Sequence, residues 1–195
     1  FGLLISASRN IVKADNELRK NLWNKPKLYG YELKDKTLGI IGLGNIGSKI
    51  AKIGKAFSMN IIANVKNKKK KRSTKVKIVP LNTLLRNSDF ITFNVPLNKK
   101  TKNLLNKINA NYLKSNSILI NLSRGGVINE DVLYDLLRKK KIFAAATDVF
   151  LHEKKINKLF SLKNIIVTPH IGAMTFDAQK VIAEKALNKI KKLIK

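Results

Sequence analysis

Short apolar runs alternate with helix-like segments along most of this chain. The runs have the length of buried strands and occupy residues 38–41, 59–65, 89–95, 117–122, 142–149 and 165–168. Between most of them, apolar residues recur at helical spacing, most clearly over 130–140, where Asn129 is a suitable N-cap. Strands that alternate with helices predict an α/β fold, a doubly wound parallel sheet that binds ligands at the carboxyl ends of its strands.

A glycine-rich turn follows the first of these runs directly and precedes a helical pattern. Residues 42–47 read GLGNIG. Gly42 permits a tight turn, Gly44 lets the backbone approach a ligand, and Gly47 lets the helix pack closely on the strand. A phosphate would then lie at the free N–H groups of that helix. The arrangement predicts a Rossmann-type domain that binds a nicotinamide or flavin dinucleotide.

The ends of the chain and one internal segment depart from the alternation. Residues 3–20 predict one helix, 21–36 a loop, 67–75 a polar loop rich in lysine, and 173–195 an amphipathic C-terminal helix. The opening residues, from Phe1 onward, resemble the interior of a helix that begins upstream, because a signal peptide would carry a basic leader and a cleavage site. We therefore expect the chain to be a fragment of a longer protein.

The net charge of the chain is strongly positive. Forty Lys and Arg against twelve Asp and Glu give +28 over 195 residues, and only six of the basic residues are arginine. The lysines are scattered through nearly every segment and have no interleaved aromatic platform for stacking bases. We interpret them as solvated faces and expect no nucleic-acid partner, although the positive field favours an anionic small-molecule substrate.

Composition also disfavours other classes of protein. No apolar run reaches the roughly 18 residues that a transmembrane helix needs, so we expect no membrane partner. The chain has no cysteine, which excludes disulfides and thiolate metal sites and fits a reducing compartment. We expect a cytoplasmic protein without a metal.

Three groups of polar residues follow predicted strands, where function is expected. Arg124 lies between a strand end and two glycines, and its planar guanidinium suits a carboxylate; the alternative is an arginine that pairs with a neighbouring acid on the surface. Asp148 ends a run, with Glu153 in the loop beyond it; singly, such carboxylates are more often caps or solvated. A lone histidine such as His170 is more often a structural hydrogen-bonder, and His152 is expected in an exposed loop.

Taken together, Arg124, Glu153 and His170 form the set that a dehydrogenase needs. Arg124 would hold a substrate carboxylate and polarise the adjacent carbonyl. His170 would exchange a proton with the substrate hydroxyl while hydride moves to or from a nicotinamide. Glu153 would orient the imidazole and favour its protonated form.

The chain resembles the D-isomer-specific 2-hydroxyacid dehydrogenases along almost its whole length. The motifs that carry the resemblance occur in the family's order: GLGNIG, NVPLNKKT, NLSRGG, ATDVFLHE and TPHIGA. Within the family, SASRNIVKAD and HIGAMTFDAQ most resemble the members that oxidise 3-phospho-D-glycerate, the entry step of serine biosynthesis. Reduction of glyoxylate or hydroxypyruvate is the alternative, and a dinucleotide-binding regulatory protein without turnover is an alternative of another class.

The resemblance assigns roles to particular residues. It implies that Arg124, Glu153 and His170 are catalytic and that Asp148 holds the nicotinamide carboxamide. The further residues that it places around the cofactor are Gly42, Gly44, Asn45, Ile46, Gly47, Val65, Val95, Leu122, Ser123, Ile171, Gly172 and Ala173.

One departure from the family concerns the cofactor. NAD-using members have an aspartate after the second strand, where it binds the adenosine ribose hydroxyls, and this chain has Val65. Lys66, Lys68 and a basic run follow, so a 2′-phosphate could be accommodated. NADP preference and weakened NAD binding are both open on this evidence. Two other departures remove no catalytic group: Lys154 replaces a usual proline, and Asn94 a common histidine.

The largest departure is length. Family members carry a separate substrate domain, and nearly all of it is absent here. We therefore expect residues 1–172 to form the dinucleotide-binding domain, with 1–20 as an interdomain and dimer helix. Residues 173–195 would cross toward the substrate domain. The family resemblance implies a homodimer when the protein is full length.

Overall fold

The computed structural model describes residues 1–66 and 76–193, and in these ranges seven parallel strands form one sheet in the order β3-β2-β1-β4-β5-β6-β7. The strands are β1 (Thr37–Ile41), β2 (Asn60–Asn64), β3 (Lys77–Ile78), β4 (Phe90–Phe93), β5 (Ile118–Asn121), β6 (Ala144–Thr147) and β7 (Ile165–Val167). The order reverses between β1 and β4, the place where doubly wound sheets bind ligands. The predicted Rossmann-type fold is confirmed. The predicted loop at 67–75 lies outside the described residues.

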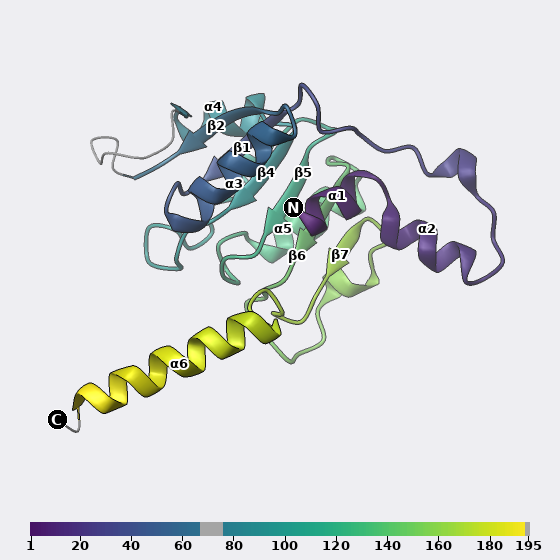
Figure 1. The fold of residues 1–195 in the computed structure, drawn as a ribbon. Helices are drawn as coiled ribbons and strands as arrows, with labels where there is room; N and C mark the ends of the chain where they lie inside the picture. The colour runs from purple at the N-terminus through teal and green to yellow at the C-terminus, as the bar shows by residue number, and fades with distance from the viewer. Residues whose placement is uncertain (67–75, 194–195) are drawn as a thin grey trace.

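Helices cover both faces of the sheet (Figure 1). They are α1 (Gly2–Ser8), α2 (Ile11–Leu18), α3 (Asn45–Ala56), α4 (Leu81–Asn87), α5 (Glu130–Arg138) and α6 (Phe176–Leu193), with 3₁₀ turns at Lys25–Lys27, Asn109–Tyr112 and Lys158–Ser161. One core cluster joins α1 and α3 to the sheet through residues such as Leu4 and Ala51. The other joins α4 and α5 to it through residues such as Leu85 and Leu137. The alternation of side chains along each strand supplies both layers.

The α5 helix begins as its sequence predicts. The Asn129 side chain accepts a hydrogen bond from the Val132 N–H at 3.1 Å, which satisfies one of the free donors of the first turn. Glu130 and Asp131 occupy that turn, where the helix dipole favours negative charge.

Two expectations about the elements are corrected, and one strand was missed. Residues 3–20 form two helices rather than one, because Asn10 adopts a left-handed φ of 55° and bonds through its side chain to the Tyr29 carbonyl. The strand β3 was not predicted, since two residues are too few to show a pattern. The C-terminal helix begins at Phe176 rather than 173, because a turn closed by the Met174 N–H on the Ile171 carbonyl precedes it.

The last helix stands apart from the rest of the fold. Figure 1 shows α6 extending away from the sheet, with its end far from the other elements. Its apolar side chains are correspondingly exposed, among them Phe176, Ile182, Leu187 and Ile190. Among the described residues, no helix is both long enough and apolar enough to cross a bilayer.

Candidate active site

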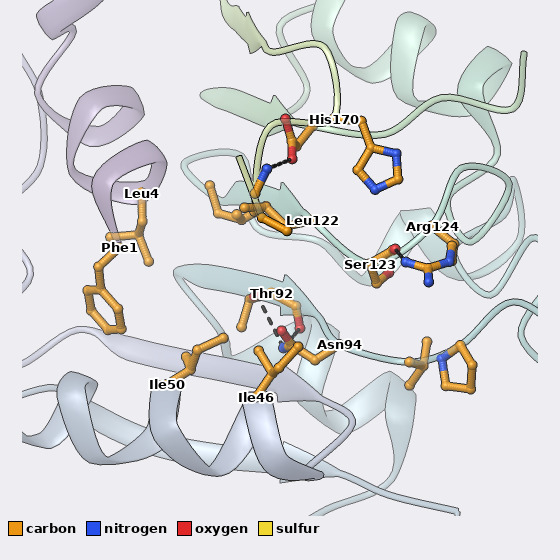
Figure 2. A pocket seen from close by; sticks show the side chains of 16 residues that line it. Phe1, Leu4, Ile46, Ile50, Thr92, Asn94, Leu122, Ser123, Arg124 and His170 are labelled. Atoms are coloured by element: carbon orange, nitrogen blue, oxygen red, sulfur yellow. Dashed lines mark hydrogen bonds between the residues drawn. The ribbon is translucent and has the colours of Figure 1, made fainter. Parts of the chain in front are cut away.

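The loops that follow β1, β4, β5, β6 and β7 meet at the carboxyl edge of the sheet and surround a cavity of about 550 Å³. Figure 2 shows the imidazole of His170 and the guanidinium of Arg124 reaching into the same part of this cavity from different loops. The predicted residues that line it are Ile46, Val95, Leu122, Ser123, Arg124, Asp148, His170, Gly172 and Ala173. The fold therefore brings together residues from five distant segments of the sequence.

The glycine loop between β1 and α3 shows a different requirement at each glycine. Gly42 has a φ of +93°, a backbone conformation that other residues rarely adopt. A Cβ at Gly47 would lie 2.0 Å from the Gly42 carbonyl oxygen, so the helix reaches its position on the strand only because this residue lacks a side chain. A Cβ at Gly44 would meet nothing within 4 Å, so the backbone there faces open space.

This open space lies at the N-terminus of α3. Gly44 is the N-cap, and no side chain caps the helix, so the first N–H groups of Asn45 and Ile46 are free to bind an anion. The cavity begins at Ile46 and continues toward Arg124 and His170. A bare helix N-terminus beside this cavity fits a dinucleotide with its pyrophosphate at α3.

The loop that carries Arg124 is organised by Asn121, whose role the sequence did not reveal. Asn121 is 4% exposed, and its Oδ1 accepts hydrogen bonds from the N–H and the hydroxyl of Ser123. Its Nδ2 donates to the Arg124 carbonyl at 3.1 Å. The guanidinium donates to the Ser123 carbonyl, and no acid of the described residues lies within ion-pair distance of it. Arg124 is therefore open to an anionic ligand.

Asp148 supports the loop that carries His170. Its side chain is buried, and its oxygens accept hydrogen bonds from the Ile171 and Gly172 N–H groups, each at 2.8 Å. The Thr168 hydroxyl donates a third. Asp148 thus caps this turn and also lies in the wall of the cavity. The predicted contact with a nicotinamide carboxamide stays a prediction.

His170 and Glu153 form a hydrogen-bonded pair. The imidazole Nδ1 lies 2.7 Å from Glu153 Oε1, and the two side chains are 46% and 48% exposed. An ionised carboxylate only accepts, so Nδ1 carries the hydrogen and Nε2 is left for a ligand. His170 has a left-handed φ of 57°, which the bonds from Asp148 to the next two residues help to hold.

Seven predicted residues are not part of the lining of this cavity: Gly42, Gly44, Asn45, Gly47, Val65, Glu153 and Ile171. Glu153 is in the wall of a second, apolar cavity, which His170, Phe150, Ile156 and Phe160 also line. Val65 follows β2 next to the glycine loop, where the Gly42 N–H bonds to the carbonyl of Asn64, and it packs half-buried against the core. His152 is exposed, as predicted.

The cavity is also lined by residues that were not predicted to belong to the site. Phe1, the N-cap of α1, lines it together with Leu4 of α1 and Ile50 of α3, and Thr92 and Asn94 also line it (Figure 2). These residues follow ordinary helix and strand patterns. Only the packing of α1 against the sheet brings its first turn to the site.

Comparison with known proteins places the chain in one family. The model of the D-isomer specific 2-hydroxyacid dehydrogenase, NAD binding domain, matches residues 1–172. The chain belongs to this family of NAD-binding domains. The family resemblance predicted from the motifs is confirmed.

The particular relatives differ in the reactions for which they are named. The chain is 42% identical over its whole length to a D-3-phosphoglycerate dehydrogenase of Methanocaldococcus jannaschii, of which it covers 38%. It is 40% identical over 97% of its length to a hydroxypyruvate reductase of Thermotoga maritima, of which it covers 63%. The chain thus spans between about two fifths and two thirds of the length of these relatives.

Two solved structures show the same fold with a dinucleotide bound. An acyclic imino acid reductase in complex with NADPH and D-Arg matches with a TM-score of 0.90 and 31% identity, covering 100% of this chain and 62% of that one. A D-lactate dehydrogenase from Aquifex aeolicus complexed with NAD and lactic acid matches with a TM-score of 0.91 and 27% identity, covering 100% and 64%.

Proposed function

We propose that this chain is the cofactor-binding part of an oxidoreductase that transfers hydride between a D-2-hydroxy acid and a nicotinamide cofactor. The observation that carries the proposal is that Arg124 and His170 line the same cavity beside the bare N-terminus of α3, with His170 hydrogen-bonded to Glu153. Family membership supports the same reaction.

Each catalytic residue has a role that its contacts support. A bound nicotinamide supplies the hydride acceptor for oxidation or the hydride donor for reduction. The Arg124 guanidinium binds the substrate carboxylate and polarises the neighbouring oxygen. In oxidation, the hydride leaves carbon 2, the hydroxyl proton moves to His170 Nε2, and the carbon–oxygen double bond forms. Glu153 holds the imidazole with Nε2 toward the substrate and stabilises the imidazolium that results.

The substrate that we propose is 3-phospho-D-glycerate, oxidised at the entry to serine biosynthesis. Support comes from the 42% identical relative named for this activity and from the positive field of the chain, which favours a doubly anionic substrate. Reduction of hydroxypyruvate or glyoxylate is the second candidate, favoured by the hydroxypyruvate reductase among the relatives and by the lysine beside Val65.

A steady-state assay of the full-length polypeptide is expected to distinguish these candidates. We expect kcat/KM for 3-phospho-D-glycerate to exceed that for D-glycerate by about tenfold or more, as the loss of one charged contact would produce. Hydroxypyruvate and glyoxylate are the reductive substrates to compare. A larger kcat/KM for either of them would favour the second candidate, and turnover of none would contradict the proposed reaction.

The full-length protein that we propose has two further properties. Residues 173–195 lead from the domain of residues 1–172 toward a substrate domain, which the projection of α6 and its exposed apolar side chains support. The protein is a cytoplasmic homodimer, and the exposed Leu22, Trp23 and Tyr29 beyond α2 support an interface there.

For the cofactor, we propose that NADP(H) binds at least as tightly as NAD(H). Val65 has no acceptor for ribose hydroxyls, and exposed Lys66 follows it. We expect Val65→Asp to shift the ratio of dissociation constants toward NAD by about tenfold, because a carboxylate there accepts from the 2′-hydroxyl and repels a 2′-phosphate. Val65→Thr is the uncharged control. Fluorescence titration with both cofactors checks the ratio, and tighter binding of NAD by the unmodified protein would contradict the preference.

A further inference from the structure

Glu130 makes contacts that its place in the sequence does not predict. As the first residue of α5 it is expected only to complement the helix dipole. Its carboxylate instead reaches the loop after β6: Oε1 accepts from the Leu151 N–H at 2.5 Å, and Oε2 accepts from Asn157 Nδ2 at 2.6 Å. These two bonds hold both ends of residues 152–156, the segment that carries Glu153.

The segment between these two bonds has little other support among the described residues. Its side chains are exposed, up to 99% at Ile156. Its internal backbone bond runs from the Lys155 N–H to the His152 carbonyl at 3.4 Å, a long distance. Lys154 has a left-handed φ of 66°, so the proline typical of the family cannot take this conformation. The loop therefore lacks the rigid pyrrolidine ring that a proline at position 154 would supply.

We propose that Glu130 is a positioning residue that keeps Glu153 in reach of His170. The chain of contacts runs from α5 through the Glu130 carboxylate to the two ends of the loop, and from Glu153 Oε1 to the His170 Nδ1. A glutamine in this place keeps one acceptor oxygen and turns the other into a donor, so it cannot accept both bonds. The loop then loses one of its two anchors, and the imidazole loses the partner that sets its tautomer. The kinetic part of this inference rests on the proposed function, while the structural part does not.

Asp131 provides a matched control on the same helix. It is the next residue in the first turn, so its neutralisation removes the same charge from the helix dipole. Its carboxylate pairs with the Lys158 ammonium, and its side chain is 82% exposed, so the pair contributes little stability. Asp131→Asn therefore changes charge near α5 without releasing the loop that carries Glu153.

The first experiment measures the tautomer of neutral His170 by ¹⁵N NMR of the full polypeptide, labelled at histidine. Loss of a signal in His170→Gln assigns the resonances. We expect the Nδ1–H tautomer in the unmodified protein and in Asp131→Asn. Glu130→Gln and Glu153→Ala are expected to shift the ring toward the mixture of a free imidazole. Because this readout needs no turnover, it tests whether Glu130 positions Glu153 (the Glu130 clamp) even if the proposed reaction is wrong.

The second experiment measures kcat. Glu130→Gln is expected to lower kcat about tenfold, within the range that misplacement of a general acid or base costs, with the cofactor dissociation constant unchanged. On a Glu153→Ala background the same change is expected to have no further effect, because Glu130 acts through Glu153. Glu130→Gln/Asn157→Asp exchanges donor and acceptor between the two side chains and is expected to restore the tautomer and kcat.

Three results would overturn the inference. One is an unchanged tautomer in folded Glu130→Gln. Another is an equal effect of Asp131→Asn, which would indicate helix charge rather than the loop. The third is full additivity of the Glu130 and Glu153 changes. If Glu130→Gln does not fold cooperatively, the tautomer of His170 is measured in Glu130→Gln/Asn157→Asp instead. A free-imidazole mixture of tautomers in that folded variant would contradict the role of Glu130.

Discussion

His170→Gln is expected to lower kcat of the full-length protein by about 10²- to 10⁴-fold, the usual contribution of a positioned general acid or base. Glutamine can still fill the site and form hydrogen bonds, but it cannot exchange a proton at the position of Nε2. Because the carboxylate contact at Arg124 remains, we expect a much smaller change in the KM of the substrate. Stopped-flow measurement of nicotinamide absorbance checks both quantities.

The pH profile provides a second signature of this residue. Oxidation needs a neutral imidazole as the proton acceptor, so kcat/KM in that direction is expected to fall as the pH is lowered. Reduction needs the imidazolium, so its kcat/KM is expected to fall as the pH is raised. Both limbs should be absent in His170→Gln.

His152→Gln is the control for this experiment. The chain has two histidines, and His152 is exposed in the loop before Glu153. The same chemical change there is expected to leave kcat and the pH profile as they are. If His170→Gln kept the biological activity of the unmodified protein, a regulatory dinucleotide-binding role without turnover would be favoured instead.

Alanine at Gly47 is expected to destabilise the fold, whereas alanine at Gly44 is expected to weaken binding of the dinucleotide. At Gly47 the new Cβ would lie 2.0 Å from the Gly42 carbonyl oxygen, and backbone on both sides prevents an easy shift. We expect Gly47→Ala to lower the free energy of unfolding by about 1–3 kcal/mol or more, the cost of overpacking, by pushing α3 away from β1. Denaturant unfolding followed by circular dichroism checks this value.

Gly44→Ala is the matched variant, because its Cβ would meet nothing within 4 Å and its φ of −86° suits alanine. We expect its free energy of unfolding to change by less than about 0.5 kcal/mol. Its dissociation constant for the dinucleotide is expected to rise by about tenfold or more, because the methyl group would occupy the space that the pyrophosphate needs. Unchanged cofactor binding in Gly44→Ala would contradict the placement of the pyrophosphate at α3.

The sequence predicted the sheet well where the signal is local, and it placed the candidate site residues at the ends of strands. The glycine loop is recognisable because the turn, the close packing and the helix N-terminus follow one another within six residues, 42–47. Arg124 and His170 could be foreseen to converge because each follows a strand, and parallel strands place their carboxyl ends along one edge. Neither inference needs knowledge of a distant contact.

Prediction failed where a distant contact decides the local structure. Residues 3–20 carry a continuous helical pattern, yet the helix breaks because Asn10 bonds to Tyr29 across the loop. Asn121 and Glu130 were missed for a similar reason. An asparagine at a strand end and a glutamate in a first helical turn are common, and only the folded chain shows that their side chains hold other loops.

The sequence by itself determined six of the seven described strands and the alternation of strands with helices, and it predicted a seat for a dinucleotide and the reactive groups, because periodicity, glycine geometry and side-chain chemistry are local properties. Only the tertiary structure decided which residues support them. The pairing of His170 with Glu153, the capping of the 171–172 turn by Asp148 and the clamp from Glu130 join segments that packing alone brings within 3 Å. Hydrogen bonds at that range depend on how the helices and loops rest on the sheet.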